Sequence, residues 1–225
     1  MKIKKTEQTY LTQGQQWESQ KQWERALTCY QHVLEINPHS FLAHVGLGNT
    51  TRELGHLKSA ILYFHQALQQ KPGSAPLHSN LANVYQLLGF PELALAHYQK
   101  SLERDPLLMP TYYILGNVLQ TLQRFAEAIQ TYYQALKIDP TYAPAHNNLA
   151  NALKTQGLYN SALFHYRQAI QLAPSFDVLY HQNVLLTLQF VPTLLAQDIF
   201  SEHSQWGQTI EALVKWQYVP VLYIQ

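Results

Sequence analysis

Five prolines of this chain recur at a constant interval of 34 residues, as Pro38, Pro72, Pro106, Pro140 and Pro174. A fixed period of this length is typical of repeat arrays, in which each structural unit contacts only its neighbours. If each proline is position 32 of a unit, the units are residues 7–40, 41–74, 75–108, 109–142 and 143–176, after a lead-in of residues 1–6. The interval therefore predicts one elongated domain of five repeats instead of a single central core.

Each unit carries the apolar pattern of two amphipathic helices joined by a short polar turn. In the fourth unit the first stripe is Tyr112, Leu115, Gly116 and Leu119, and the second is Ala128, Tyr132, Ala135 and Leu136. Steps of three and four residues place each set on one face of a helix. The expected helix boundaries are marked by Gly55, Gly89 and Gly157 after the first helix, by the five periodic prolines after the second, and by Pro76, Pro110 and Pro144 in the first turn of the next unit.

Two pairs of residues recur at corresponding positions of the units. The first pair is Leu47 with Gly48, Leu81 with Ala82, Leu115 with Gly116, and Leu149 with Ala150; the second is Ala26 with Tyr30, Ala60 with Phe64, Ala94 with Tyr98, Ala128 with Tyr132, and Ala162 with Tyr166. Together with the prolines, these pairs resemble the pattern of the tetratricopeptide repeat family. The resemblance implies an all-α fold, a right-handed superhelix of stacked helix-turn-helix repeats, and a role in protein binding. The first unit departs from the pattern at Gln13, which is either a polar cap or simple divergence.

The composition excludes several classes of function. Lys plus Arg (15) nearly balances Asp plus Glu (14), so the chain lacks the basic field of a nucleic-acid-binding protein. Cys29 is the only cysteine, which rules out an internal disulfide and a cysteine-based zinc site. The sequence has no apolar run of about 18 residues. We therefore expect a cytoplasmic protein that binds neither nucleic acid nor membrane; whether the array forms a homodimer is left open.

Candidate catalytic or metal-binding residues are few. His44, His78 and His146 occupy the position that the resembled family usually gives to tryptophan. Equivalent positions of successive repeats are about 8–10 Å or more apart, whereas zinc holds nitrogen ligands at about 2.0–2.1 Å. We interpret these histidines as packing residues with one ring nitrogen hydrogen-bonded, and we predict no metal, no cofactor and no catalytic residue in this chain.

The repeat register slips by one residue after Pro174, and a different pattern follows. Residues 181–207 supply, in order, His181, Asn183, Leu185, Leu188, Pro192, Phe200, Glu202, His203, Trp206 and Gly207. This segment resembles the one that follows the repeats in SPINDLY-type O-linked N-acetylglucosamine transferases, with departures at Thr187, Gln189 and Phe190. The resemblance implies a helical cap over residues 177–207, with a second helix through Leu195, Ile199, Phe200, His203 and Trp206. Residues 208–225 form a tail, truncated if the resemblance holds, and show no sign of the glycosyltransferase region that would follow.

A set of asparagines forms the candidate binding site. Asn49, Asn83, Asn117 and Asn151 recur at position 9 of their units, and Asn80 and Asn148 lie at position 6. With the buried stripe at positions 4, 7, 8 and 11, both positions are expected to face away from the second helix. The resembled transferases hold the backbone of extended substrates with asparagines at position 6, which Asn80 and Asn148 match and Gly46 and Ile114 do not. An amide offers both a donor and an acceptor, so such a row can bind a peptide of any sequence.

The binding energy expected from this row is modest. Six hydrogen bonds at roughly 0.5–1.5 kcal/mol each supply about 3–9 kcal/mol, against an association cost of roughly 4–15 kcal/mol. The alternative is that the asparagines bond neighbouring helices and bind nothing. A clamp for a C-terminal carboxylate is disfavoured because position 5 of the units carries no Lys or Arg.

Two functions are compatible with these patterns. The first is a protein-interaction module that acts as the substrate-recognition arm of an O-linked N-acetylglucosamine transferase without its catalytic half. The second is a stand-alone tetratricopeptide scaffold or adaptor unrelated to glycosyl transfer. In neither is the chain itself an enzyme.

Overall fold

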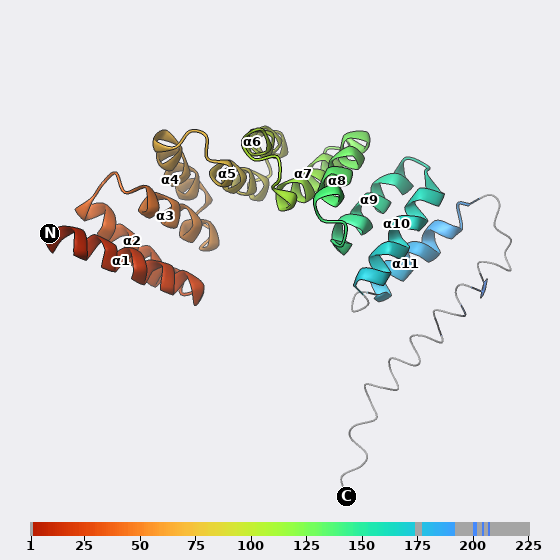
Figure 1. Ribbon diagram of the computed structural model, residues 1–225, viewed down its shortest axis with the longest axis horizontal. Coiled ribbons are helices and arrows are strands. Elements are labelled where there is room, and N and C mark those ends of the chain that lie inside the picture. Colours follow the sequence, from red (N-terminus) through yellow and green to blue (C-terminus); the bar gives the residue numbers. More distant parts are fainter. Residues whose placement is uncertain (1, 174–176, 192–199, 202–203, 205–206, 208–225) are drawn as a thin grey trace, which may run out of the picture. The chain divides into compact units, whose positions relative to one another are not determined.

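In the computed structural model, which describes residues 2–173, 177–191, 200–201, 204 and 207, every regular element of the described chain is a helix (Figure 1). The helices are α1 (Lys2–Ser19), α2 (Trp23–Ile36), α3 (Phe41–Glu53), α4 (Leu57–Gln70), α5 (Ala75–Leu87), α6 (Pro91–Arg104), α7 (Met109–Thr121), α8 (Phe125–Ile138), α9 (Ala143–Thr155), α10 (Tyr159–Leu172) and α11 (Asp177–Leu188). They form two units, one with α1 to α7 in residues 1–122 and one with α8 to α11 in residues 123–225. The predicted all-helical fold class is confirmed.

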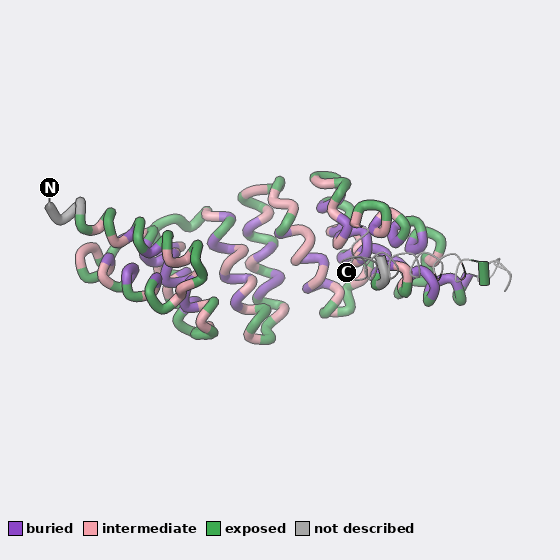
Figure 2. The backbone as a smooth tube through the Cα atoms, turned by 90° about the horizontal axis from the view of Figure 1, so that it is seen from below, coloured by how far each residue is buried: buried purple, intermediate pink, exposed green. Residues whose placement is uncertain are grey.

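Within each unit, helices pack against their neighbours in sequence. Each first helix of a repeat contacts the second, as in α1 with α2, α3 with α4, α5 with α6 and α9 with α10. Each second helix also contacts the first helix of the next repeat, as in α2 with α3 and α8 with α9. Buried residues therefore lie along the facing sides of the helices (Figure 2). This is the neighbour-to-neighbour packing that the 34-residue period predicts.

The helix boundaries follow the predicted signals. The second helices α2, α4, α6 and α8 end at Ile36, Gln70, Arg104 and Ile138, each two residues before a periodic proline. Pro76, Pro110 and Pro144 lie in the first turn of α5, α7 and α9. Pro174 lies outside the described residues.

The turn inside each repeat places position 15 in the left-handed conformation. Gly55, Gly89 and Gly157 have φ of 78°, 77° and 75° there, as predicted for a glycine that ends a helix. The first and fourth repeats carry Lys21 and Gln123 at the same position, with φ of 56° and 58°. These two residues adopt a conformation that L side chains disfavour.

The core is built from aromatic rings that cover small residues. The side chains of Tyr30, Phe64, Tyr98, Tyr132 and Tyr166 at position 24 are 0% to 2% exposed. A Cβ atom added to Gly14 would lie 2.7 Å from the Tyr30 ring, so the ring fits only over a glycine there. Small residues at position 8 therefore make room for the aromatic ring of the same repeat.

Two boundaries differ from the sequence-based expectation or complete it. Helix α1 begins at Lys2, so it includes most of the predicted lead-in 1–6. Helix α11 ends at Leu188, before Pro192. The second helix predicted through Leu195, Ile199, His203 and Trp206 lies almost wholly outside the described residues, as does the tail 208–225. None of the described helices is both long enough and apolar enough to span a membrane.

Candidate functional site

Two hollows lie side by side between the first helices of the unit with α1 to α7. Hollow 1 has a volume of about 450 Å³ and is lined by Glu18, Ser19, Trp23, Asn49, Arg52, Glu53 and Asn80. Hollow 2 has a volume of about 700 Å³ and is lined by Arg52, Asn83, Gln86, Leu87, Ile114 and Asn117. Both volumes are in the range of ligand-binding clefts. Arg52 lines both hollows and lies where they meet.

Four of the six predicted asparagines line these hollows. Asn49 and Asn80 belong to hollow 1, and Asn83 and Asn117 belong to hollow 2. Each of the four is partly buried. Helical geometry thus brings positions 6 and 9 of successive first helices to one surface, as the pattern predicts.

The other two asparagines lie on α9 in the second unit, where their amides bond inside the protein. Asn148 Oδ1 accepts a hydrogen bond of 3.1 Å from Asn147 Nδ2, and Asn147 Oδ1 accepts one of 3.0 Å from Asn183 Nδ2 on α11. Asn151 Oδ1 accepts one of 2.6 Å from the Tyr166 hydroxyl. For Asn151 in particular, the alternative interpretation of a bond to a neighbouring helix applies.

The expectation that position 9 faces away from the second helix is wrong for two repeats. The Tyr98 hydroxyl on α6 donates to Asn83 Oδ1 on α5, and the Tyr166 hydroxyl on α10 donates to Asn151 Oδ1 on α9. The physical reason is the length of tyrosine, since its ring is buried between the helices and its hydroxyl must find an acceptor at the far end. Position 9 therefore lies at the edge of the helix pair, within reach of that hydroxyl.

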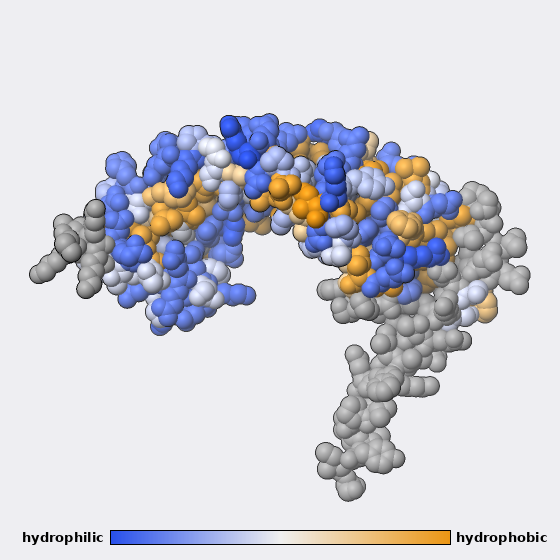
Figure 3. All heavy atoms as spheres, viewed as in Figure 1, coloured by the Kyte–Doolittle hydropathy of each residue, from blue (hydrophilic) through white to orange (hydrophobic). Residues whose placement is uncertain are grey.

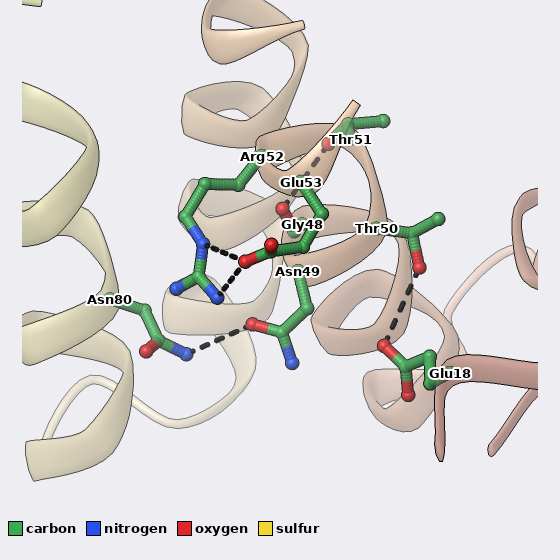
Figure 4. A network of polar contacts seen from close by, with 8 residues as sticks. All are labelled: Glu18, Gly48, Asn49, Thr50, Thr51, Arg52, Glu53 and Asn80. Atoms are coloured by element: carbon green, nitrogen blue, oxygen red, sulfur yellow. Dashed lines mark hydrogen bonds and ion pairs between the residues drawn. The ribbon is translucent and has the colours of Figure 1, made fainter. Parts of the chain in front are cut away.

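Asn49 is the exception because the second repeat has Phe64 at position 24, which carries no hydroxyl. Its Oδ1 instead accepts a hydrogen bond of 3.2 Å from Asn80 Nδ2 of the next repeat. Figure 4 shows Asn49 and Arg52 directed from α3 towards Asn80, while Thr50 points to the opposite side, towards Glu18. The pair presents Asn49 Nδ2 as a donor and Asn80 Oδ1 as an acceptor, side by side in hollow 1.

The remaining polar groups of hollow 1 are bonded to one another. Arg52 donates to Glu53 Oε1 from Nε at 3.1 Å and from Nη2 at 2.7 Å. Glu18 accepts a hydrogen bond of 2.6 Å from the Tyr30 hydroxyl and one of 3.4 Å from Thr50 Oγ1. Burial, and then the bond to Glu18, raise the pKa of Tyr30, so its hydroxyl stays a donor. Glu18 thus does for the first repeat what asparagine does for the third and fifth.

Sequence reasoning missed the charged residues of the site. Glu18, Arg52 and Gln86 all lie at position 12 of their units, and Glu53 and Leu87 lie at position 13. Positions 12 and 13 are one helical turn after position 9 and so share its face. Adding three and four residues to the asparagine position would have found them.

The periodic histidines are packing residues, as interpreted. His44 Nδ1 lies 3.0 Å from Ser40 O, His78 Nε2 lies 3.1 Å from Pro72 O, and His146 Nε2 lies 3.0 Å from Pro140 O. In the third and fifth repeats the other ring nitrogen meets a second histidine, with Nδ1 atoms 3.2 Å apart in His78 and His97 and 3.0 Å apart in His146 and His165. The described residues contain no group of three or more side chains able to hold a metal ion.

The tautomers of these histidine pairs follow from their partners. The carbonyl of Pro72 can only accept, so Nε2 of His78 carries a proton and its Nδ1 accepts from His97. Burial, followed by the neighbouring His78, lowers the pKa of His97 to about 4. Burial and then His146 lower the pKa of His165 to about 4 as well. Both pairs are therefore neutral at pH 7.

Family models match along the array. Models described as tetratricopeptide repeat match residues 16–75, 75–106 and 143–176, and one described as TPR repeat matches residues 116–157. The chain is therefore a tetratricopeptide repeat protein. A search of curated proteins gives no significant match.

Several solved structures share the fold. The crystal structure of YrrB, titled a TPR protein with an unusual peptide-binding site, is similar with a TM-score of 0.66 and 24% identity over 80% of this chain and 90% of that one. The thermophilic TPR protein TTC0263 of Thermus thermophilus gives 0.60 and 24% over 80% and 99%. MamA 41-end from Desulfovibrio magneticus RS-1 gives 0.70 and 19% over 76% and 97%. These matches give no support to the predicted relationship with O-linked N-acetylglucosamine transferases.

Proposed function

We propose that this chain is a protein-interaction module that binds an extended polypeptide segment along the first helices of residues 1–122. The observation that carries the proposal is the Asn49–Asn80 pair, which leaves one amide donor and one amide acceptor in hollow 1. A peptide group has the complementary acceptor and donor, whatever its side chain. The printed title of the YrrB structure, a tetratricopeptide protein with a peptide-binding site, is consistent with this use of the fold.

The expected affinity is low for a single hollow. Two amide hydrogen bonds contribute about 1–3 kcal/mol, which is less than the roughly 4–15 kcal/mol lost on association. An extended chain rises about 3.3 Å per residue, so a segment of several residues can pass from hollow 1 to hollow 2. Binding therefore depends on both hollows and on side-chain contacts within them.

The test is a titration of the purified chain with a fluorescein-labelled pool of unstructured twelve-residue peptides of random sequence, read by fluorescence anisotropy. We expect Asn49→Ala combined with Asn80→Ala to weaken binding about threefold to tenfold, because two hydrogen bonds are lost. Gln69→Ala is the matched control, since it removes an exposed amide of α4 outside both hollows. Unchanged binding by the double variant would rule out hollow 1 as the site.

Variants of the other position-9 asparagines are less suitable for such a test. Asn83 and Asn151 accept hydrogen bonds from buried tyrosines, so replacing them is expected to lower stability. A loss of binding by those variants would not separate recognition from folding. Asn49 and Asn80 have no tyrosine partner of this kind and avoid the ambiguity.

The finer function, that of a substrate-recognition arm for an O-linked N-acetylglucosamine transferase, rests on the sequence of residues 181–207 alone. A stand-alone scaffold or adaptor accounts for the repeats equally well. Reading the genomic sequence downstream of codon 225 separates the two, because a transferase reading frame there favours the arm. We propose no catalytic role for the chain itself, and measurable hydrolysis of UDP-N-acetylglucosamine by the purified chain would overturn this.

A further inference from the structure

Hollow 2 differs in charge from hollow 1. Arg52 is the only charged residue of its lining, and the other five are uncharged. Hollow 1 contains Glu18 and Glu53 besides Arg52. A ligand that spans both hollows therefore meets a net positive charge in hollow 2 and a net negative charge in hollow 1.

The amides of hollow 2 are oriented as donors. The Tyr98 hydroxyl lies behind Asn83 and Gln86 and donates to Asn83 Oδ1 and, at 3.2 Å, to Gln86 Oε1. With both carbonyl oxygens directed at Tyr98, the NH₂ groups of Asn83 and Gln86 are left for the hollow. The Tyr98 hydroxyl is held as a donor, because burial raises its pKa while the Arg52 charge opposes this only in part.

Arg52 has donors to spare. Both of its hydrogen bonds go to a single oxygen of Glu53, the next residue of α3. Of the described residues, only Glu53 accepts from Arg52, which leaves Nη1 and its two protons for a ligand. The side chains of Arg52 and Glu53 are 22% and 38% exposed, and an ion pair open to water in this way is weak. A second carboxylate can therefore bind Arg52 without displacing the first.

Apolar side chains complete hollow 2. Leu87 at the end of α5 is 63% exposed, and Ile114 of α7 is partly buried. On the face seen in Figure 3, hydrophobic residues form separate groups among hydrophilic ones. A small apolar group of this kind, next to donors and a cation, is suited to one aliphatic side chain and not to a broad apolar surface.

We propose that hollow 2 selects an internal acidic residue followed by an aliphatic residue in the extended segment of a partner protein. The carboxylate of the partner bonds Arg52, and the aliphatic side chain contacts Leu87 and Ile114. This proposal rests on the proposed function and adds sequence preference to a site that the asparagines alone would leave tolerant. The carboxylate comes from a side chain, because a single arginine without a basic residue at position 5 makes no clamp for a chain terminus.

The experiment uses four labelled peptides with acetylated and amidated ends and Ser-Gly flanks, which carry Glu-Leu, Gln-Leu, Glu-Ser or Lys-Leu at the centre. We expect the Glu-Leu peptide to bind about threefold to tenfold more tightly than the Gln-Leu peptide, as for a partly exposed charge-assisted hydrogen bond. Arg52→Gln should abolish this ratio, and Arg52→Glu should favour Lys-Leu. Arg104→Gln, which removes an exposed arginine of α6 outside the hollows, should retain it.

The outcomes separate this proposal from the proposed function. If all four peptides bind equally, or if Arg52→Gln keeps the preference for Glu-Leu, the selectivity is wrong while peptide binding stands. If none of the four binds at millimolar concentration, both fail. A fifth peptide with Gln-Leu and a free C-terminal carboxylate tests the other source of the anion, and tighter binding of this peptide than of Glu-Leu would overturn the assignment to a side chain.

Discussion

The second and fifth repeats place asparagine at the same position of the same helix, yet the two side chains have different roles. In the fifth repeat, Asn151 accepts a hydrogen bond from the buried Tyr166 and belongs to the core. In the second repeat, Phe64 replaces the tyrosine, and Asn49 pairs with Asn80 in an open hollow. One hydroxyl group on the second helix thus decides whether the asparagine of the first helix stabilises the fold or faces a ligand.

The largest expected effect on stability is that of Asn151→Ala. It leaves the hydroxyl of Tyr166, a side chain that is 0% exposed, without its acceptor, and the expected loss of unfolding free energy is about 2 kcal/mol. Asn49→Ala, the equivalent change in the second repeat, should cost less than about 0.5 kcal/mol because its partner Asn80 can bond water. Urea denaturation of both variants measures the difference.

A second change controls for the hydroxyl itself. Tyr166→Phe in the Asn151→Ala background removes the orphaned donor and should restore about half of the lost free energy. Equal losses for Asn49→Ala and Asn151→Ala would contradict the division of roles between the two repeats.

Acid should destabilise the repeats that carry histidine pairs. The pKa values of His97 and His165 are lowered to about 4 from an ordinary value of 6.5, so the unfolded chain binds protons between these limits that the folded chain does not. Stability is therefore complete above about pH 6.5 and falls as the pH decreases. After allowance for partial exposure, the expected loss is about 1 kcal/mol per pair at about pH 5.

The second repeat again supplies the matched variant, because Tyr63 occupies the position of His97 and His165 there. His97→Tyr should remove its share of the pH dependence while the pair in the fifth repeat keeps its own. Charges near the pair, which include Lys100, Arg104 and Glu103 around His78, are left in place by this change. A pH profile of unfolding that is identical in the variant and the parent would exclude the pair as the cause.

The smallest expected effect is at the turn inside the first repeat. Lys21 has a φ of 56°, in a conformation that Gly55, Gly89 and Gly157 adopt in other repeats. Lys21→Gly should relieve this strain and raise the unfolding free energy by about 0.5–1 kcal/mol, after the larger entropy loss of glycine is subtracted. Thermal unfolding measures it, with Gly55→Ala expected to shift the melting temperature in the opposite direction.

Much of the fold could be predicted from the sequence, because the period fixes which residues are equivalent. The positions of Pro38 and Gly55 indicated helix ends, and the recurrence of Tyr98 and Ala82 at their positions indicated the core. The course of residues 192–199 and 208–225 lies outside the described structure, and the predicted cap there stays a prediction.

The site was harder to predict than the fold. The period places Asn49, Asn83 and Asn151 at one position, but it cannot say that a tyrosine hydroxyl from the second helix reaches two of them. That contact depends on the length of one side chain across the helix pair, which the rotation angle along one helix does not include. Arg52 was missed because the search followed a repeated residue type, whereas position 12 changes from Glu18 to Arg52 to Gln86.

The central claim is that Phe64 leaves the Asn49–Asn80 pair free for a peptide, and Phe64→Tyr tests it most directly. The new hydroxyl would stand where Tyr98 and Tyr166 carry theirs and would bond Asn49 Oδ1. We predict that this variant keeps or slightly raises its melting temperature and binds the random peptide pool about threefold less tightly, as expected for the loss of one hydrogen bond. Peptide binding equal to that of the parent chain, with the hydroxyl bonded to Asn49, would contradict the claim.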